Sequence, residues 1–536
     1  MPPIDPSNPA PWTLRLKHHK TTILIHISPL TTLKSIKQSL LKALQERTPS
    51  GILNGHQIPN DASDIRLAKA VDPLDLDQGW EEISVDADSE GIAKSIGMKN
   101  GGALAFRFVE EEEKTEDEDE DEMVLDGSKW KGQWDVVIPK FDDDFGLLVL
   151  TVGVTAIPVP GFNFLTNSKG FSCPILSSSA GGKAICISGN VAVQASATNR
   201  KLNIANPTNQ YAATETFVEY FQANSSLPSS SNGGPATVSG TYNINAKLCY
   251  PVSSTASNLS TVQFLIHGIN FDKLYWNIPG QSYLDAAAAA GYVTLSYDRL
   301  GTGLSDHPDP IQVVQSALHV EIAHQLIQSL RSGAVGGVQF QNVVGIGHSY
   351  GSIQTVGLAV SYPKDLDAII LQGFTMEGSN IPATIAAFHP SIAAQNDPVR
   401  FGRLPNGYQV VNSAIGDQTA FYRYPNFSPS TFAHLNAKKQ TFSLGDFFTL
   451  TDPVSPATAF TGPVSVVNGQ NDFIFCASDC GYPSDLGAGV LSVLFPAASS
   501  LSTSYLVPGT GHGINAHTTA PQAYKQMVAF IRSAGL

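Results

Sequence analysis

The chain has little charge and no long apolar run. Only 15% of its 536 residues are charged, whereas globular domains average about 25%, and 42% are hydrophobic, which excludes a wholly disordered protein. Acidic residues outnumber basic ones by 46 to 32, and the net charge of −14 argues against a nucleic-acid partner. No apolar run reaches the roughly 18 residues of a membrane-spanning helix, so no transmembrane span is expected. The length implies two or more domains.

Cysteine is missing from the first 172 residues. All five cysteines follow that point, and so do the three Asn-x-Ser/Thr sequons, at Asn224, Asn258 and Asn426. Each sequon alone is weak evidence for glycosylation, because the chain is rich in serine. Together with the cysteines, they predict that the part after about residue 157 is secreted into an oxidising, glycosylating compartment.

The amino terminus lacks the basic and apolar regions of a secretory signal. The most apolar run is internal, at residues 145–160, and its length and its small residues at 154–156 are typical of a signal segment. Its acidic flank is wrong for a signal, and a buried strand or helix is the alternative. We hypothesise that the chain joins two coding units, an intracellular amino-terminal part and a secreted remainder, through a natural fusion or an over-extended gene model.

The amino-terminal part has the pattern of a small α+β domain. Apolar and polar residues alternate over 13–17 and 22–27, which predicts a hairpin, and the apolar residues of 33–44 recur at helical spacing. A later apolar strand is expected at 103–109. This order of elements resembles the ubiquitin-like β-grasp fold over residues 12–110, and the resemblance implies a possible protein partner for this region.

An acidic run follows the predicted domain. Residues 110–122 hold eleven acids and one lysine, a net charge of −10 that leaves only −4 for the rest of the chain. We interpret residues 110–144 as a solvated acidic linker, with a docking site for a basic partner as the alternative. Residues 1–11 are expected to be disordered.

From about residue 263, apolar strands alternate with helical stretches, which predicts a parallel sheet with crossover helices. The expected strands are 263–267, 293–297, 342–347, 368–372, 464–468 and 504–507.

A Gly-His-Ser-Tyr-Gly sequence at 347–351 ends the third of these strands. The pentapeptide Gly-x-Ser-x-Gly is common by chance, but here a strand precedes it and a plausible helix, 352–362, follows it. This context predicts a tight strand-to-helix turn that exposes the Oγ of Ser349. Small residues at 347 and 351 would let neighbouring backbone approach.

A serine hydroxyl needs a base to become a nucleophile, and the base needs an orienting acid. Asp472 and His512 each come just after a predicted strand, where the loops of open α/β sheets collect catalytic groups. We therefore predict that Ser349, Asp472 and His512 form a catalytic triad. For the oxyanion hole we expect the backbone N–H groups of Tyr350 and Ile269, with Asn270 as the alternative to Ile269 and His267 shaping the loop.

Residues 170–536 resemble an α/β-hydrolase with a serine nucleophile, of the secreted fungal type. The resemblance rests on His267-Gly268, the Asp-Arg-Leu-Gly-Thr-Gly-Leu-Ser sequence at 298–305, the serine pentapeptide and the predicted acid and base. It implies a mostly parallel sheet with helices on both faces. It also implies a cap inserted at residues 374–460, called the cap segment below, whose many aromatic residues form either its core or an apolar substrate pocket.

The cysteines allow more than one pairing. Cys476 and Cys480 lie close enough in sequence to bridge and hold the loop of Asp472, and Cys173 with Cys186 is a second possible pair, with Cys249 left over. Spacing alone does not decide the pairing. No Cys/His cluster has metal-site spacing and no glycine-rich stretch has a nucleotide-binding pattern, so neither metal nor cofactor is expected.

These observations predict a serine hydrolase that cleaves carboxylic esters, on a small and apolar substrate, through an acyl-enzyme at Ser349. A serine at a position where epoxide hydrolases and dehalogenases carry aspartate favours acyl transfer. Peptidase, lactonase and lipase activities use the same triad and stay open. The alternative from another class is a ubiquitin-like interaction protein that carries an inactive hydrolase fold.

Overall fold

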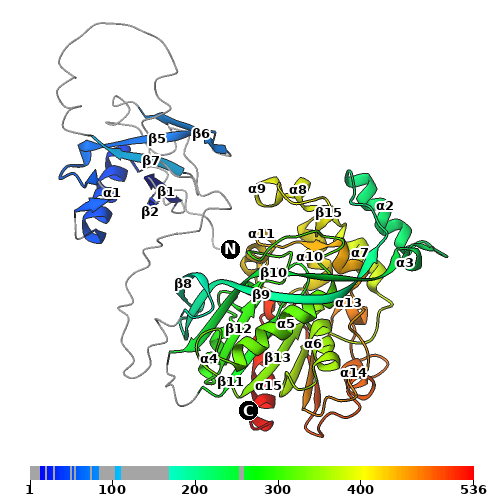
Figure 1. Cartoon of the computed structure of the whole chain (residues 1–536). Coiled ribbons are helices and arrows are strands. Elements are labelled where there is room, and N and C mark those ends of the chain that lie inside the picture. The colour runs from blue at the N-terminus through cyan, green and yellow to red at the C-terminus, as the bar shows by residue number, and fades with distance from the viewer. Residues whose placement is uncertain are drawn as a thin grey trace, which may run out of the picture. The chain divides into compact units, whose positions relative to one another are not determined.

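The computed structural model of the chain describes residues 12–18, 21–27, 31–48, 51–53, 56–72, 75–83, 103–109, 168–252 and 259–536. These residues belong to two compact units, Met1–Pro158 and Val159–Leu536 (Figure 1). Three of the segments discussed above lie outside the described residues: the amino-terminal 1–11, the acidic linker after residue 109, and the signal-like run 145–160. The same holds for Asn258.

The first unit is a five-stranded sheet with one long helix. The strands stand in the order β2-β1-β7-β5-β6, in which β1 and β7 are parallel and the other pairs are antiparallel. Their bounds are β1 Trp12–His18, β2 Thr21–Ile27, β5 Ile65–Asp72, β6 Asp75–Glu82 and β7 Ala103–Phe108, and the short β3 (Ile52–Leu53) and β4 (His56–Gln57) pair separately. The ubiquitin-like assignment of this unit stays a prediction.

Helix α1 (Leu33–Arg47) covers that sheet with the face that the sequence predicts. Thr32 caps its start by accepting a hydrogen bond from the N–H of Ser35. The apolar residues at helical spacing are buried against the sheet, and the cluster comprises Leu33, Ile36, Leu40 and Leu44 of the helix with Leu14, Leu16, Ile65, Leu67, Leu104 and Phe106 of the strands.

The second unit is built on a nine-stranded sheet in the order β19-β18-β14-β13-β11-β12-β10-β9-β8. The first six of these are parallel, and the last three are antiparallel (Figure 1). The parallel strands are β11 Thr261–Ile266, β12 Val293–Tyr297, β13 Asn342–His348, β14 Ala368–Gln372, β18 Val464–Gly469 and β19 Thr503–Val507. They are the six strands that the sequence predicts, so the expected α/β-hydrolase fold is confirmed.

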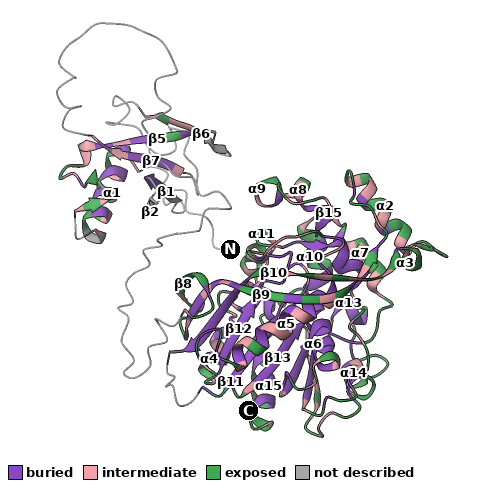
Figure 2. Ribbon diagram, viewed as in Figure 1, coloured by how far each residue is buried: buried purple, intermediate pink, exposed green. Residues whose placement is uncertain are grey.

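Helices pack on this sheet, and every residue of its central strands is buried except Asn342 at the start of β13. Figure 2 shows the parallel strands as the purple core of the unit, as expected for strands covered on both faces. The helices that pack on the sheet include α4 Tyr283–Ala289, α5 Ser316–Arg331, α6 Tyr350–Ser361, α14 Leu486–Leu494 and α15 Ala520–Ser533.

A long two-stranded ribbon was not predicted. Strands β9 (Ala184–Leu202) and β10 (Asn232–Pro251) pair antiparallel along nearly their whole lengths. The chain between them forms α2 (Gln210–Phe221) and α3 (Leu227–Ser230). The ribbon is rich in Ala, Asn, Ser and Thr, so it lacks the apolar runs that mark the buried strands.

The ribbon corrects one of the expected disulfides. Cys186 of β9 lies directly opposite Cys249 of β10, and these two residues form the disulfide. Cys173, in β8 (Ser172–Ser178), is exposed, and the register of β8 places Ser177 opposite Cys186 instead. The possible pair Cys173–Cys186 is therefore wrong, and Cys249 is not left over. Strand register decided the pairing, and register is not visible in the spacing of cysteines.

The cap segment folds between β14 and β18. It contains a small sheet, β15 (Ser391–Ile392), β16 (Tyr408–Val410) and β17 (Phe442–Ser443), with α7 Ile381–Phe388, α8 Ala393–Asn396, α9 Pro398–Phe401, α10 Ala414–Phe421, α11 Pro429–Ala437 and α12 Leu444–Phe448. Most of its aromatic residues are buried: Phe388, Phe401, Tyr408, Phe421, Tyr422, Phe442, Phe447 and Phe448. They pack with one another and with the core, which favours the structural interpretation for most of them.

Helix α2 adds to the cap segment from a distant part of the chain. The Nε2 of Gln210 donates to the carbonyl of Pro390, and the Oε1 of Gln210 accepts from the N–H of Ile392. The rings of Phe217 and Tyr220 lie 5.0 and 4.8 Å from that of Phe447.

In the part of the chain that the structure describes, no helix has the length and apolarity needed to cross a bilayer.

Candidate active site

The turn between β13 and α6 holds Ser349 in a strained conformation. Its φ of 55° and ψ of −117° lie in a region that residues other than glycine rarely adopt. The turn is held because the N–H of Ser349 donates to the carbonyl of Gln372 in β14 (2.9 Å) and its own carbonyl accepts from Ser352 and Ile353. The side chain of this residue is therefore fixed at the carboxyl end of the sheet.

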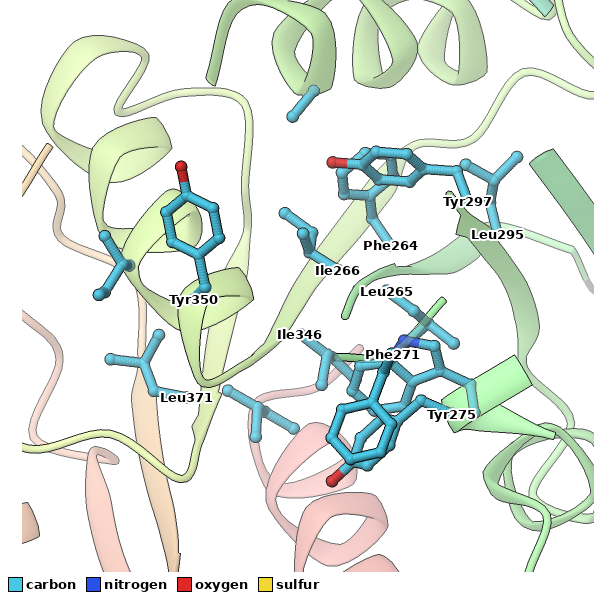
Figure 3. Packing of buried hydrophobic residues seen from close by; sticks show 14 of the residues in the cluster. Phe264, Leu265, Ile266, Phe271, Tyr275, Leu295, Tyr297, Ile346, Tyr350 and Leu371 are labelled. Atoms are coloured by element: carbon cyan, nitrogen blue, oxygen red, sulfur yellow. The ribbon is translucent and has the colours of Figure 1, made fainter. Parts of the chain in front are cut away.

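Two glycines make this turn possible. A Cβ on Gly351 would lie 2.1 Å from the carbonyl oxygen of Ile266, and a Cβ on Gly347 would lie 2.3 Å from that of Gly351. Both contacts are with backbone, which cannot move aside. Ile266, Ile346 and Tyr350 are among the buried side chains around the turn in Figure 3. The residues 347–351 are called the nucleophile elbow below.

Asp472 and His512 form a buried hydrogen-bonded pair. Oδ2 of Asp472 lies 2.6 Å from Nδ1 of His512, and neither residue is exposed. Oδ1 of Asp472 accepts from the N–H of Phe475 (3.0 Å), because the aspartate also caps α13 (Phe473–Cys476). The ionised carboxylate fixes the tautomer with a proton on Nδ1, which leaves Nε2 of His512 as an acceptor. Among the described residues, this Nε2 has no hydrogen-bond partner.

The loop of Asp472 is closed by the disulfide expected between Cys476 and Cys480. Within it, the N–H of Ser478 donates to the carbonyl of Asp472 (2.8 Å), and Nδ2 of Asn471 donates to the carbonyl of Ser478 (3.1 Å). The disulfide and these bonds fix the loop that carries Asp472.

The loop of His512 is held by a second histidine, His517, which no sequence motif marks. Nε2 of His517 accepts from the N–H groups of Gly511 (3.1 Å) and Arg423 (2.8 Å), and its Nδ1 donates to the carbonyl of Gly513 (2.9 Å). Burial lowers the pKa of His517 to about 4, so it is neutral and can both accept and donate. All three partners of His517 are backbone groups, which carry no side-chain pattern. The sequence around His517 therefore does not reveal its role.

One predicted glycosylation site has another role in the structure. Asn426 is half-buried, and its Nδ2 donates to the carbonyl of Gly509 (2.8 Å) in the loop that leads to His512. The amide nitrogen that an N-glycan would occupy is thus engaged in the fold. Asn224 is exposed, and its glycosylation stays a prediction.

Aromatic rings surround His512. The rings of Phe421, in the cap segment, and Phe475 both lie 5.7 Å from the ring of His512, and that of His348 lies 5.0 Å away. Nε2 of His348 donates to the carbonyl of His512 (3.0 Å). Burial holds the pKa of His348 well below its usual range, so this ring is neutral. The ring of His512 therefore sits in a largely apolar setting.

The loop after β11 passes directly over the elbow. A Cβ on Gly268 would lie 2.8 Å from the Cβ of Ser349, so glycine alone permits this approach. Burial holds the pKa of His267 well below its usual range. Its Nε2 accepts from the N–H of Arg299 (3.0 Å), so its Nδ1 carries the proton and donates to the carbonyl of Gly268 (2.8 Å).

The same peptide group carries the carbonyl of Gly268 and the N–H of Ile269. In a trans peptide the two point in opposite directions, so His267 orients the N–H of Ile269 by holding the carbonyl. The N–H of Tyr350, the first residue of α6, has no carbonyl within its own helix to bond with. Gly268 packs against Ser349 and Tyr350 follows it in the chain, and the oxyanion role of Ile269 and Tyr350 stays a prediction.

In the loop with the sequence Asp-Arg-Leu-Gly-Thr-Gly-Leu-Ser, the aspartate, Asp298, has a structural role. Oδ2 of Asp298 accepts from Nζ of Lys273 (2.6 Å) and from the N–H of Leu304 (2.9 Å), and its Oδ1 accepts from the N–H of Lys273 (3.0 Å). A Cβ on Gly303, which has a φ of 61°, would lie 2.4 Å from Asp298 Oδ2. The buried carboxylate therefore organises the loop after β12.

A cleft of about 500 Å³ lies beside the loop of Asp472. It is lined by Ile415, Gln418, Thr419, Tyr422, Arg423 and Tyr424 of the cap segment and by Asn471, Phe473 and Ser478. Ser349 does not line this cleft.

Within the described ranges, no group of histidine, cysteine and carboxylate side chains could hold a metal ion.

Residues 264–526 match the model of the alpha/beta hydrolase family. With the sheet order and the elbow described above, this match identifies an alpha/beta hydrolase family domain in the chain. Such a domain suggests a small-molecule substrate. No curated protein matches the chain.

Solved structures with low identity are similar to part of this chain. An esterase from Thermogutta terrifontis is 14% identical and has a TM-score of 0.38, over 55% of this chain and 95% of its own. A soluble variant of monoglyceride lipase from Saccharomyces cerevisiae is 15% identical with a TM-score of 0.39, over 55% and 92%. An epoxide hydrolase from Vigna radiata is 14% identical with a TM-score of 0.37, over 54% and 95%. Similarity at this level says nothing about activity.

Proposed function

We propose that the second unit is a serine hydrolase that cleaves carboxylic esters through an acyl-enzyme intermediate. The observation that carries the proposal is the buried pair of Asp472 and His512, whose Nε2 is left as an acceptor at the sheet edge that also holds Ser349 in its strained turn. A base of this kind has a clear use only where a proton must be taken and returned.

In the proposed reaction, Oγ of Ser349 attacks the ester carbonyl carbon while Nε2 of His512 takes the hydroxyl proton. The N–H groups of Ile269 and Tyr350 stabilise the oxyanion, and Asp472 stabilises the imidazolium. His512 then gives its proton to the departing alkoxide, and the acyl group stays on Ser349. Water next attacks the acyl carbon as His512 takes its proton, and the carboxylic acid leaves when that proton returns to Oγ.

An apolar ester is the best-supported substrate. Phe421 and Phe475 flank the base, and Ser349 is only 8% exposed, so a substrate must lie among aromatic side chains to reach it. Lipase, lactonase and peptidase activities remain alternatives within the class. The alternative from another class is an interaction protein with a ubiquitin-like amino-terminal region and a hydrolase fold that does not turn over substrate.

We also propose that the second unit is secreted. Its two disulfides support an oxidising compartment. Peptides that span residues 140–166 in the proteome of the source organism would support a true fusion of the two units. Separate transcripts for the two parts would rule it out.

Labelling with a fluorophosphonate probe tests the proposal. The full chain, expressed through a secretory pathway, should be labelled, and the matched Ser349→Ala variant should not. Labelled protein should also hydrolyse p-nitrophenyl esters, with kcat/KM rising as the acyl chain is lengthened. A folded, monodisperse protein that is not labelled would contradict the proposal and favour the interaction protein.

A further inference from the structure

Asp446 brings a buried carboxylate from the cap segment to the base of the nucleophile elbow. It lies in α12 and is 1% exposed. A capping box starts this helix: Oγ of Ser443 accepts from the N–H of Asp446 (2.8 Å), and Oδ2 of Asp446 accepts from the N–H of Ser443 (3.1 Å). The capping box occupies Oδ2, so Oδ1 is available to other groups.

Oδ1 of Asp446 meets three buried side chains from three other elements. Nε2 of His319 in α5 lies at 2.8 Å, the hydroxyl of Tyr350 in α6 at 3.1 Å, and Nη1 of Arg299, in the loop after β12, at 3.9 Å. All of them are 2% exposed or less. One carboxylate oxygen thus joins the cap segment to the core below Ser349.

The charges in this cluster follow from its surroundings. Burial alone raises the pKa of Asp446, but His319, Arg299 and the N–H of Ser443 outweigh it and bring the pKa below its ordinary value, so the carboxylate is ionised. Burial lowers the pKa of His319 and holds the pKa of Tyr350 well above its usual range. The imidazole and the protonated phenol therefore donate to Oδ1, and Arg299 supplies a compensating positive charge.

The residues of this cluster contact both the ring and the hydroxyl of Tyr350. Cζ of Arg299 lies 4.6 Å from the centre of its ring, and the ring of His319 meets it edge-on at 5.9 Å. Its hydroxyl donates to Asp446 and lies 2.7 Å from Oγ of Ser316. With the side chain fixed in this way, the backbone N–H beside Ser349 has little freedom to move.

Arg299 also reaches the second oxyanion donor. Its backbone N–H holds His267, and its Nη2 lies 3.5 Å from the carbonyl of Gly268, at the outer limit of a hydrogen bond. That carbonyl belongs to the peptide group whose N–H is that of Ile269. The guanidinium that Asp446 attracts is therefore in contact with both sides of the oxyanion hole.

We propose that Asp446 is a positioning residue for the hydrolysis, and that it orients the backbone N–H groups of Tyr350 and Ile269 through Tyr350 and Arg299. This inference rests on the proposed function. Buried ion pairs add little net stability over apolar side chains of the same size, so a stabilising role alone does not account for this cluster. On this view the cap segment contributes to the rate of the reaction as well as to the choice of substrate.

Asp446→Asn, compared with a matched variant, tests the inference. The control is Asp365→Asn, which breaks another His–Asp pair that involves helix α5: Oδ2 of the buried Asp365 lies 2.6 Å from Nδ1 of the half-buried His324, away from the elbow. Both variants should lower the melting temperature. Asp446→Asn should also lower kcat by about 10- to 100-fold, because losing an oxyanion donor costs about 10²- to 10³-fold and displacing one costs less. KM should change less than about threefold.

A transition-state analogue separates positioning from a general loss of structure. The inhibition constant of a trifluoromethyl ketone should rise in Asp446→Asn by the factor that kcat/KM falls, and should stay unchanged in Asp365→Asn. Tyr350→Phe removes only the hydroxyl, so it should lower kcat in the same sense by about 3- to 10-fold. If the Asp446→Asn protein does not fold, the Tyr350→Phe variant takes its place in the test.

Equal activity in Asp446→Asn and Asp365→Asn, or a loss confined to KM, would overturn the inference and leave the proposed function intact. So would a Tyr350→Phe enzyme with the kcat and inhibition constant of the unmodified protein. An unmodified protein that the fluorophosphonate does not label would instead overturn the proposed function, and the positioning role would fall with it.

Discussion

Nδ1 of His512 lies 2.6 Å from Oδ2 of Asp472, and both side chains are completely buried. The two residues are 40 positions apart in the chain and follow adjacent parallel strands, β18 and β19. A pair held so far from water keeps its geometry without the competition of solvent, which suits it to orient a base.

Asp472→Asn should lower kcat for ester hydrolysis by about 10⁴-fold, because the amide no longer fixes the tautomer of His512. The fold should survive, since asparagine also caps helices well and α13 keeps its first turn. Steady-state kinetics with a p-nitrophenyl ester measure the effect. Asp479→Asn, an exposed carboxylate in the same loop, is the matched control and should retain full activity. An Asp472→Asn enzyme with more than about a tenth of the activity would refute this role.

Gly351→Ala should destabilise the second unit by about 3 kcal/mol or more, because its Cβ would stand 2.1 Å from the carbonyl oxygen of Ile266. The control is Gly489→Ala in α14, where a Cβ meets nothing within 4 Å and the gain in helix propensity is up to about 1 kcal/mol. Urea denaturation of both variants gives the comparison. Equal midpoints would contradict the packing of the elbow.

The two disulfides should have separable effects. Replacing Cys186 and Cys249 by serine opens a loop of sequence separation 63, and chain entropy predicts a loss of about 4 kcal/mol in the free energy of unfolding. Replacing Cys476 and Cys480 opens a separation of only 4, for a loss of about 2 kcal/mol. The second pair should nevertheless lower kcat more, because it holds the loop of Asp472. A larger loss of kcat on replacing Cys186 and Cys249 would show that the loop of Asp472 does not need its disulfide.

The stability of the second unit should fall in mild acid through His517. Its folded pKa of about 4 lies below the ordinary value of 6.5, so the unfolded chain binds a proton that the folded one excludes. This contribution is fully present above pH 6.5 and is lost as the pH falls to about 4, by up to about 3 kcal/mol. His517→Gln should therefore show a shallower dependence of the urea midpoint on pH across that window. Parallel curves for the two proteins would contradict the assignment.

Much of the second unit could be predicted from local patterns. Strands buried on both faces are rich in apolar residues, as β11 to β14 and β18 are, and the edge strand β19 ends in a short apolar stretch. The order of serine, aspartate and histidine, each after a predicted strand, then selected three residues, and the structure brings two of them, Asp472 and His512, into hydrogen-bonding contact. In the first unit, the spacing of Leu33, Ile36, Leu40 and Leu44 selected the buried face of α1.

The ribbon of β9 and β10 and its disulfide could not be predicted in the same way. Cys186 and Cys249 meet because two strands of mostly small polar residues pair in one register, and register depends on the whole length of both strands. Helix α2 likewise packs against Phe447, and this contact joins residues more than 200 positions apart in the chain.

By itself, the sequence determined the alternation of strands and helices, the nucleophile elbow and the order of the candidate triad, because each depends on residues close together in the chain. Only the tertiary structure decided which cysteines pair, that His517 holds the loop of His512, and that Asp446 of the cap segment meets Tyr350 and Arg299. These contacts join groups that no local pattern relates. Their geometry is set by how the sheet, its helices and the cap segment pack.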